Sequence, residues 1–158
     1  RIIGLYVDIL DDGAEKKRNL RSINDMLKEN NIARGAYFCD YVIFKNMYQL
    51  EARNMVRTGK MVYLCLLNLQ YGEEEAPTEQ DIEYRMKELR ESIANNLRAG
   101  DCFCRYSTTQ FILLLPASTY DVGNLVMKRI NSDYKSRGNC QDAIIEWELV
   151  PVEPVTVK

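Results

Sequence analysis

The sequence contains no histidine among its 158 residues. Histidine is the commonest general base in enzymes and the usual partner of a serine or cysteine nucleophile. Its absence excludes every such pair and removes a frequent metal ligand. Long apolar runs are missing as well, because no segment approaches the roughly 20 residues that a membrane-spanning helix needs. We therefore expect neither a histidine-dependent enzyme nor an association with a membrane.

An excess of charge of either sign is also lacking, since 21 basic residues face 23 acidic ones and the net charge is −2. Proteins that bind nucleic acid carry a basic patch or stripe, and the two signs are mixed throughout this chain. We expect no direct contact of this segment with DNA or RNA. No signal peptide is visible, but the sequence starts without Met, so a missing leader carries little weight.

Cysteine is present in an odd number, five. Cys65, Cys102 and Cys104 fall in segments with strand character. Neither a CxxC pair nor a histidine accompanies them, which leaves a zinc site short of ligands. We interpret them as reduced, buried thiols of a cytoplasmic protein rather than as a disulfide framework, and we expect no metal and no cofactor.

The apolar fraction of 46% suffices for the core of one domain. After a first expected helix over about 16–30, periodicity predicts the order helix, strand, helix, strand, strand, helix, strand, with residues 1–10 ambiguous between strand and helix. The expected helices span about 16–30, 40–57, 78–97 and 118–130, and the expected strands span 61–69, the two arms of a hairpin within 97–116, and 143–150.

Capping residues place the helix starts. Asp40 can cap the second helix, and Thr78 to Asp81 fits a capping box for the third. Ser118 to Asp121 is a candidate box for the fourth. The residues expected to face inward are Phe44, Met47, Tyr48 and Leu50 in the second helix, Ile82, Met86, Leu89, Ile93 and Leu97 in the third, and Val122, Leu125, Val126 and Ile130 in the fourth.

The stretch 97–116, LRAGDCFCRYSTTQFILLLP, has the pattern of a β-hairpin. In its first strand Cys102 and Cys104 share one face and Phe103 lies on the other. Residues 112–115 are all apolar, which predicts a strand covered on both faces. The element order indicates an α+β fold with a central mixed or antiparallel sheet and flanking helices. We expect one face of the sheet to carry the helices, as in ferredoxin-like and palm-type folds.

The hairpin resembles the signature of the GGDEF family, whose members make cyclic di-GMP from two molecules of GTP. The likeness covers roughly residues 40–151. More narrowly, residues 35–69, GAYFCDYVIFKNMYQLEARNMVRTGKMVYLCLLNL, are similar to a divergent group at the C-terminal end of bacterial transcriptional activators. The resemblance implies a nucleotide-cyclase palm-like fold with a ferredoxin-like core. It also implies that residues 1–35 are a helical linker or the tail of a preceding activator domain, and that residues 36–158 are the degenerate GGDEF-like domain.

The motif of active family members is altered here. Ser107, Thr108, Thr109 and Gln110 stand where the family has Gly-Gly-Asp/Glu-Glu, and residues 68–70, Asn-Leu-Gln, replace a pair of aspartates around one residue. Phosphoryl transfer depends on Mg²⁺ to neutralise developing charge, and Mg²⁺ prefers anionic oxygen ligands. Asn68, Gln70 and Gln110 keep the shape of carboxylates without their charge. The resemblance therefore implies a catalytically inactive domain rather than an active diguanylate cyclase.

Arg98 and Asp101 match an Arg-x-x-Asp pattern at which active family members bind the product dinucleotide. The resemblance thus implies an alternative function, a cyclic di-GMP receptor, because arginine can hold a phosphate bidentately. A purely structural interpretation is that Asp101 caps the hairpin entry and Arg98 is a solvated cation at a helix end. We favour the structural interpretation, because such short patterns recur by chance.

An aromatic group precedes and opens the second helix, namely Tyr37, Phe38, Tyr41, Phe44 and Tyr48. We expect these rings to pack the helix on the sheet, and an exposed patch would instead indicate an interface. Together with the resemblance, these observations predict a cytoplasmic regulatory domain of a transcription regulator that serves dimerisation or signal relay. Its expected partners are a second copy, another protein and the remainder of the regulator.

Overall fold

The structure is a computed structural model that describes residues 19–30, 32, 34–72, 76–116, 118–138, 140 and 142–156. Contacts divide the chain into two units, residues 1–33 and residues 34–158. In the first unit the described residues form helix α2 (Leu20–Leu27), which begins where the Asn19 side chain accepts a hydrogen bond from the Ser22 N–H at 2.8 Å. The ambiguous residues 1–10 and the start of the helix predicted over 16–30 lie outside the described residues.

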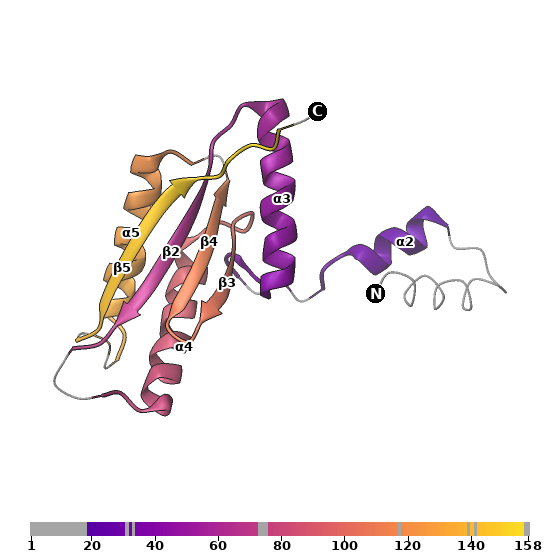
Figure 1. The fold of residues 1–158 in the computed structure, drawn as a ribbon. Coiled ribbons are helices and arrows are strands. Elements are labelled where there is room, and N and C mark those ends of the chain that lie inside the picture. The colour runs from indigo at the N-terminus through magenta and orange to yellow at the C-terminus, as the bar shows by residue number, and fades with distance from the viewer. Residues whose placement is uncertain are drawn as a thin grey trace. The chain divides into compact units, whose positions relative to one another are not determined.

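The second unit is an α+β fold around one five-stranded sheet (Figure 1). Its strand order is β1-β3-β4-β2-β5, and β1 runs parallel to β3 while all other neighbours are antiparallel. The predicted fold class, a mixed sheet with flanking helices, is confirmed. The elements are β1 (Tyr37–Phe38), α3 (Tyr41–Thr58), β2 (Val62–Gln70), α4 (Glu79–Asn96), β3 (Cys102–Ser107), β4 (Gln110–Pro116), α5 (Tyr120–Lys135) and β5 (Ile144–Pro151).

Two of the three predicted helix starts are confirmed. Asp40 accepts a hydrogen bond from the Ile43 N–H, and Thr78 and Asp81 form a reciprocal capping box. The third prediction is wrong, because Thr119 and not Ser118 caps α5. This shift by one residue puts Val122 at the third helical position, where an apolar side chain cannot return the hydrogen bond that a capping box requires.

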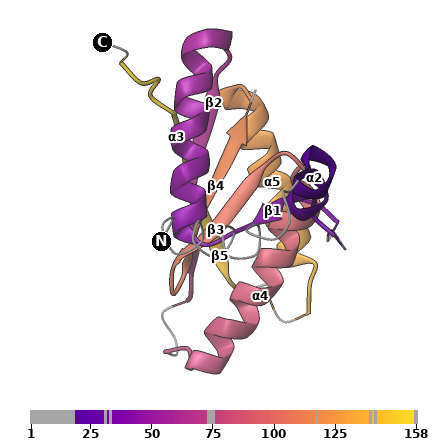
Figure 2. The ribbon, with the colours of Figure 1, turned by 90° about the vertical axis from the view of Figure 1, so that its right-hand side faces the viewer.

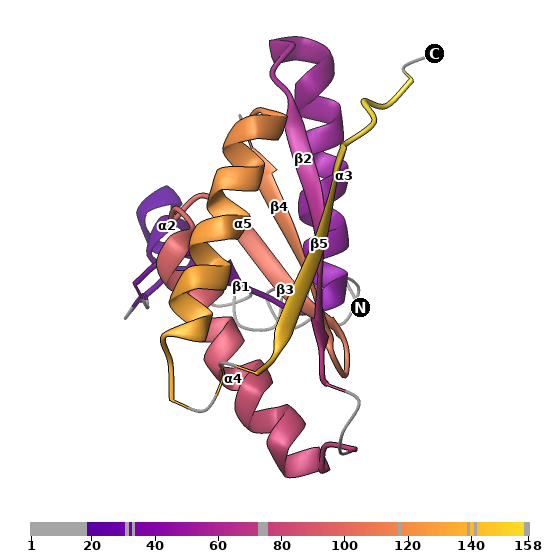
Figure 3. The ribbon, with the colours of Figure 1, turned by 90° about the vertical axis from the view of Figure 1, so that its left-hand side faces the viewer.

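Helices cover both faces of the sheet, which corrects the expectation of a single covered face. Viewed from either edge, α4 and α5 lie on one side and α3 on the other (Figures 2 and 3). The reason is the alternation in β4, where Leu113 and Leu115 point to α4 and α5 while Ile112 and Leu114 point to α3. Both sets are apolar, so each requires its own cover.

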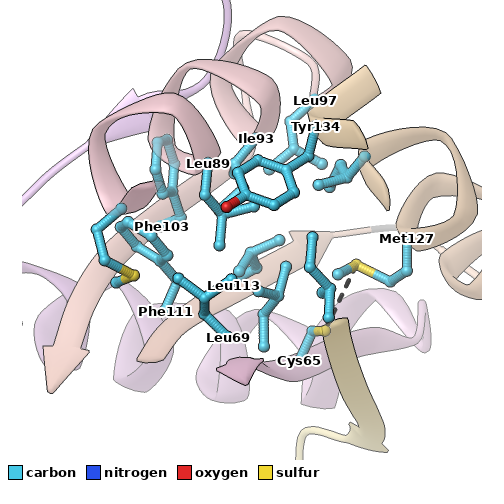
Figure 4. Close-up of a cluster of buried hydrophobic side chains, with 14 of the residues drawn as sticks. Cys65, Leu69, Leu89, Ile93, Leu97, Phe103, Phe111, Leu113, Met127 and Tyr134 are labelled. Carbon is cyan, nitrogen blue, oxygen red and sulfur yellow. Dashed lines mark hydrogen bonds between the residues drawn. The ribbon is translucent and has the colours of Figure 1, made fainter. Parts of the chain in front are cut away.

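The larger core lies between the sheet and the pair α4 and α5 (Figure 4). Tyr134 of α5, Ile93 of α4 and Phe103 of β3 are fully buried there. The Cys65 thiol also lies in this core, 3.5 Å from the Met127 sulfur, and burial raises its pKa to about 12. The stripe predicted for α4 is confirmed, because its residues line this core.

The prediction of an inward-facing side chain is wrong for three residues. Leu50, Val122 and Leu125 are 52%, 46% and 59% exposed. In α5 the cause is Gly123, which faces β5 so closely that a Cβ there would lie 2.6 Å from Leu149 Cδ2. The absence of a side chain at Gly123 lets the first turn of α5 approach the sheet. Because α5 is rotated so that Gly123 faces the sheet, Val122 is turned outward.

All five cysteines are free and buried, which confirms the predicted burial. Cys102 and Cys104 face α3 together with Cys39, whose thiol donates a 3.6 Å hydrogen bond to the Phe103 carbonyl. Among the residues that the structure describes, no three His, Cys, Asp or Glu side chains are grouped to hold a metal ion. None of the described helices is long and apolar enough to cross a bilayer.

Candidate functional site

The hairpin turn and the end of β2 lie side by side, because Asn68 pairs with Gln110 in the β2–β4 register. Ser107 Oγ donates to Gln110 Oε1 at 2.8 Å, and Gln110 Nε2 donates to Asn68 Oδ1 at 2.7 Å. The structure thus brings together three of the motif positions. We call Asn68, Ser107 and Gln110 the neutral cluster, since its members carry no charge and form hydrogen bonds with one another.

Gln70 does not join the neutral cluster. Its side-chain amide donates instead to Glu146 of β5 at 2.9 Å. Thr108 and Thr109 are the two residues between the strands, and the Thr109 carbonyl accepts a 2.9 Å hydrogen bond from the Leu69 N–H. The turn is therefore fastened to β2 through its backbone as well as through side chains.

Arg105 organises the turn, although the sequence alone did not single it out. Its guanidinium donates to the carbonyls of Ser107, at 3.1 Å, and Thr108, at 2.7 Å. It also forms a bidentate pair with Glu83 of α4, with N···O distances of 2.9 and 2.7 Å. The hydrogen bonds from Arg105 lower the pKa of Glu83 below its ordinary value. The turn, β3 and α4 are thereby joined through one side chain.

Asp101 lies at the other end of the hairpin, where it closes a tight turn with Arg98. Asp101 Oδ2 accepts the Arg98 N–H at 2.9 Å, and the Asp101 N–H donates to the Arg98 carbonyl at 3.0 Å. Only 4% of Asp101 is exposed, and burial raises the pKa of its carboxyl against the lowering effect of Arg98. The Arg98 guanidinium, whose side chain is 68% exposed, donates to the Pro116 carbonyl at 3.1 Å.

The full length of β3 separates these two ends. At about 3.3 Å per residue, a six-residue strand spans roughly 20 Å. The Arg98–Asp101 pair and the neutral cluster are therefore two separate places on the hairpin and not parts of one site.

A groove that sequence reasoning missed lies between α4 and the strands β1, β3 and β4. Its volume is about 390 Å³. Its sequence signals are scattered over β1, α4 and the hairpin, so only the fold brings them together. The residues that line it are Phe38, Glu83, Met86, Lys87, Arg90, Arg105 and Phe111.

The predicted packing of the aromatic group is partly wrong. Phe44 is buried, but Tyr37 and Phe38 are each 39% exposed and Tyr41 is 51% exposed. Tyr37 and Phe38 are partly exposed because β1 is a two-residue strand at the edge of the sheet, and Tyr41 is the first residue of α3. Tyr41 instead contacts the exposed Tyr106, with ring centroids 5.9 Å apart.

No family model matches the sequence, and no curated protein matches it. Solved structures do match. The diguanylate cyclase SiaD of Pseudomonas aeruginosa, in complex with its activator SiaC, is 16% identical with a TM-score of 0.62, and the match covers 96% of this chain and 60% of that chain. The chain therefore spans less than two thirds of the SiaD chain.

Two GGDEF domains match over most of both chains. That of DgcB from Caulobacter crescentus, in complex with c-di-GMP, is 10% identical with a TM-score of 0.61, and the match covers 81% of each chain. That of FimX from Pseudomonas aeruginosa is 14% identical with a TM-score of 0.53, and the match covers 84% of this chain and 85% of that one. The chain has the fold of GGDEF diguanylate cyclase domains, and the expected palm-like architecture is confirmed.

Proposed function

We propose that this chain is a catalytically inactive GGDEF-like domain that acts in regulation or protein interaction within a bacterial transcriptional regulator. The neutral cluster carries the proposal. Mg²⁺ requires anionic oxygens to support phosphoryl transfer, and Asn68 and Gln110 offer amides that already bind each other. The context of a transcription regulator rests on the sequence resemblance alone, and the fold supports only the GGDEF-like part of the proposal.

The carboxylates that contact this region also support the proposal. Glu83 is paired with Arg105, and Glu146 accepts from Gln70. Each is thus held by a partner that competes with a metal ion for its oxygens. A magnesium centre here would have to break one of these contacts and still lack a second anionic ligand from the turn.

The direct test is incubation of the purified chain with GTP and Mg²⁺, followed by separation of nucleotides. We expect no dinucleotide product. Formation of cyclic di-GMP by the unaltered chain, above the level of a buffer control, would overturn the proposal. A folded sample, judged by a cooperative unfolding transition, makes the negative result meaningful.

A cyclic di-GMP receptor is the second candidate, and the exposed Arg98 guanidinium favours it. Against it stands Asp101, whose carboxylate is buried and already accepts the Arg98 N–H. Titration calorimetry with cyclic di-GMP separates the two candidates. Saturable binding that Arg98→Ala abolishes, and that the distant control Arg53→Ala retains, would make the chain a receptor. We expect no saturable heat.

Interaction with a protein, either a second copy or another chain, is the remaining part of the proposal. The exposed rings of Tyr37, Phe38 and Tyr41 support it, because exposed aromatic residues are enriched at interfaces. The fold neighbour SiaD was solved with an activator protein. Sedimentation analysis over a range of concentrations distinguishes self-association, which shifts the sedimentation coefficient, from a requirement for a separate partner.

A further inference from the structure

The floor of the groove beside α4 is apolar. Met86 and Phe111 are each 1% exposed, and Phe38 contributes a partly exposed ring that packs on Phe103 with centroids 5.0 Å apart. A volume of about 390 Å³ accommodates one large side chain. The groove is thus shaped for an apolar or aromatic anchor.

The rim of the groove is positively charged. Lys87 and Arg90 lie three residues apart on α4, so they share a face of the helix. Within the described part of the chain neither forms an ion pair, and the Arg90 guanidinium lies 4.7 Å from the centroid of the Phe38 ring. The remaining rim charges, Arg105 and Glu83, neutralise each other. Two uncompensated cations therefore flank the apolar floor.

The outer edge of β1 offers backbone groups that form no hydrogen bond within the described part of the chain. Tyr37 N–H donates to the Asp101 carbonyl and Cys39 N–H donates to the Phe103 carbonyl, so both point toward β3. Because hydrogen-bonding direction alternates along a strand, the N–H and C=O of Phe38 point away from β3. β1 is the last strand of the sheet on this side. An extended peptide can add to such an edge.

From these three features we propose that the groove and the β1 edge bind an extended acidic segment of a partner protein, with one apolar or aromatic side chain in the groove. Acidic side chains complement Lys87 and Arg90, and the backbone pairs with Phe38. This inference rests on the proposed interaction function and names the class of partner for it.

The test uses fluorescently labelled peptides of about ten residues, the length of a typical strand-adding ligand. One peptide is rich in glutamate with a central tryptophan, a second replaces that tryptophan by glycine, and a third replaces the glutamates by lysine. Fluorescence anisotropy with the full chain should show saturable binding of the first peptide only. Affinity should fall as salt rises, because the rim charges are exposed.

Charge reversal assigns the surface. The double variant Lys87→Glu/Arg90→Glu should have at least about tenfold lower affinity for the acidic peptide, and it should bind the lysine peptide instead. The matched control Arg53→Glu/Lys128→Glu changes the net charge equally at exposed positions outside the groove and should bind like the unaltered chain. Phe38→Ala should abolish the preference for tryptophan over glycine. Each variant is first shown to unfold cooperatively.

Several results would overturn the inference. The first is a lack of saturable binding of the acidic peptide up to about 1 mM, which corresponds to weak affinity. The second is an equal loss of peptide affinity in the control double variant. The third is saturable binding of GTP or cyclic di-GMP in the groove with no binding of the peptide. The outcome is independent of the proposed loss of catalysis, because GTP turnover is measured separately. If the chain both turned over GTP and bound the peptide, only the proposed loss of catalysis would be overturned.

Discussion

The two ends of the β3–β4 hairpin satisfy their polar groups in opposite ways. At the turn, neutral side chains and Arg105 form a partly exposed network, whereas at the entry a single buried carboxylate, that of Asp101, accepts a backbone N–H. The pKa values follow this division, because that of Glu83 at the turn is lowered and that of Asp101 at the entry is raised. The comparison predicts that the turn, whose side chains are partly exposed, tolerates substitution better than the buried entry. We therefore expect substitutions at the entry to cost more stability than substitutions at the turn.

The largest effect is expected for Gly35→Ala, beside the hairpin entry. Gly35 has φ +98°, and an added Cβ would overlap the backbone oxygen of Ala94. The adjacent Ala36 N–H donates to that same oxygen, so relief of the overlap would disturb β1. We expect a loss of about 3 kcal/mol or more in the free energy of unfolding, measured by urea denaturation.

Gly100→Ala is the matched control, since a Cβ at Gly100 would meet nothing within 4 Å. Its effect should stay within about 0.5 kcal/mol. Equal losses in the free energy of unfolding for the two variants would show that the close approach of Gly35 to α4 has no special effect on stability.

Asp101→Ala should have the next largest effect. The substitution removes the acceptor of the Arg98 N–H at a nearly fully buried position. A loss of about 1–3 kcal/mol in the free energy of unfolding is expected from such an unsatisfied group. Asp101→Asn keeps an acceptor oxygen and should lose less. If alanine and asparagine proved equally harmless, the entry would not depend on this hydrogen bond.

A smaller effect is expected when charge is restored at the turn. In Asn68→Asp/Gln110→Glu two carboxylates would replace amides whose atoms now lie 2.7 Å apart. Their repulsion should destabilise the chain at pH 8 by about 1 kcal/mol, and protonation near pH 4 or millimolar Mg²⁺ should relieve it. The measurement is thermal unfolding of the double variant and of each single variant. Insensitivity of the double variant to both Mg²⁺ and pH would show that the two side chains separate.

The smallest effects are opposite slopes of stability with pH. Because the folded-state pKa of Asp101 is raised, its contribution is largest below its ordinary value of 3.8 and falls as pH rises through the raised pKa. For Glu83 the lowered pKa gives stability that is present above its ordinary value of 4.5 and is lost as pH falls through the lowered pKa.

These slopes are measured as melting temperature against pH. Asp101→Asn should remove the first contribution and Glu83→Gln the second. Slopes of the same sign, obtained by subtracting each variant from the unaltered chain, would contradict the division between the two ends.

The strands and helices with strong local signals were predictable. The apolar run of β2, the capping box of α4 and the apolar stretch of β4 each carry their information within a few residues. The rotation of α5 was not predictable in the same way, because it depends on contact between Gly123 and Leu149. A helical stripe alone does not tell which neighbour will approach it most closely.

The candidate site was predictable only in part. The resemblance placed Asn68 and Gln110 at related positions, and the β2–β4 register explains why they meet. The pair Arg105–Glu83 joins a strand to a helix 22 residues away, and such contacts follow from the fold rather than from spacing. The groove beside α4 has the same origin, because its residues come from four separate elements.

Because all five thiols are buried, their reactivity reports local unfolding of the protein. Burial raises the pKa of Cys65 and Cys102 to about 12 and that of Cys104 to about 11, so the reactive thiolate is scarce while the fold is closed. Cys65 lies in the core under α4 and α5, and Cys102 and Cys104 lie in the core under α3. The rate at which each thiol is alkylated therefore follows the local opening of one face of the sheet, and peptide mapping of the alkylated chain would reveal which helix detaches first.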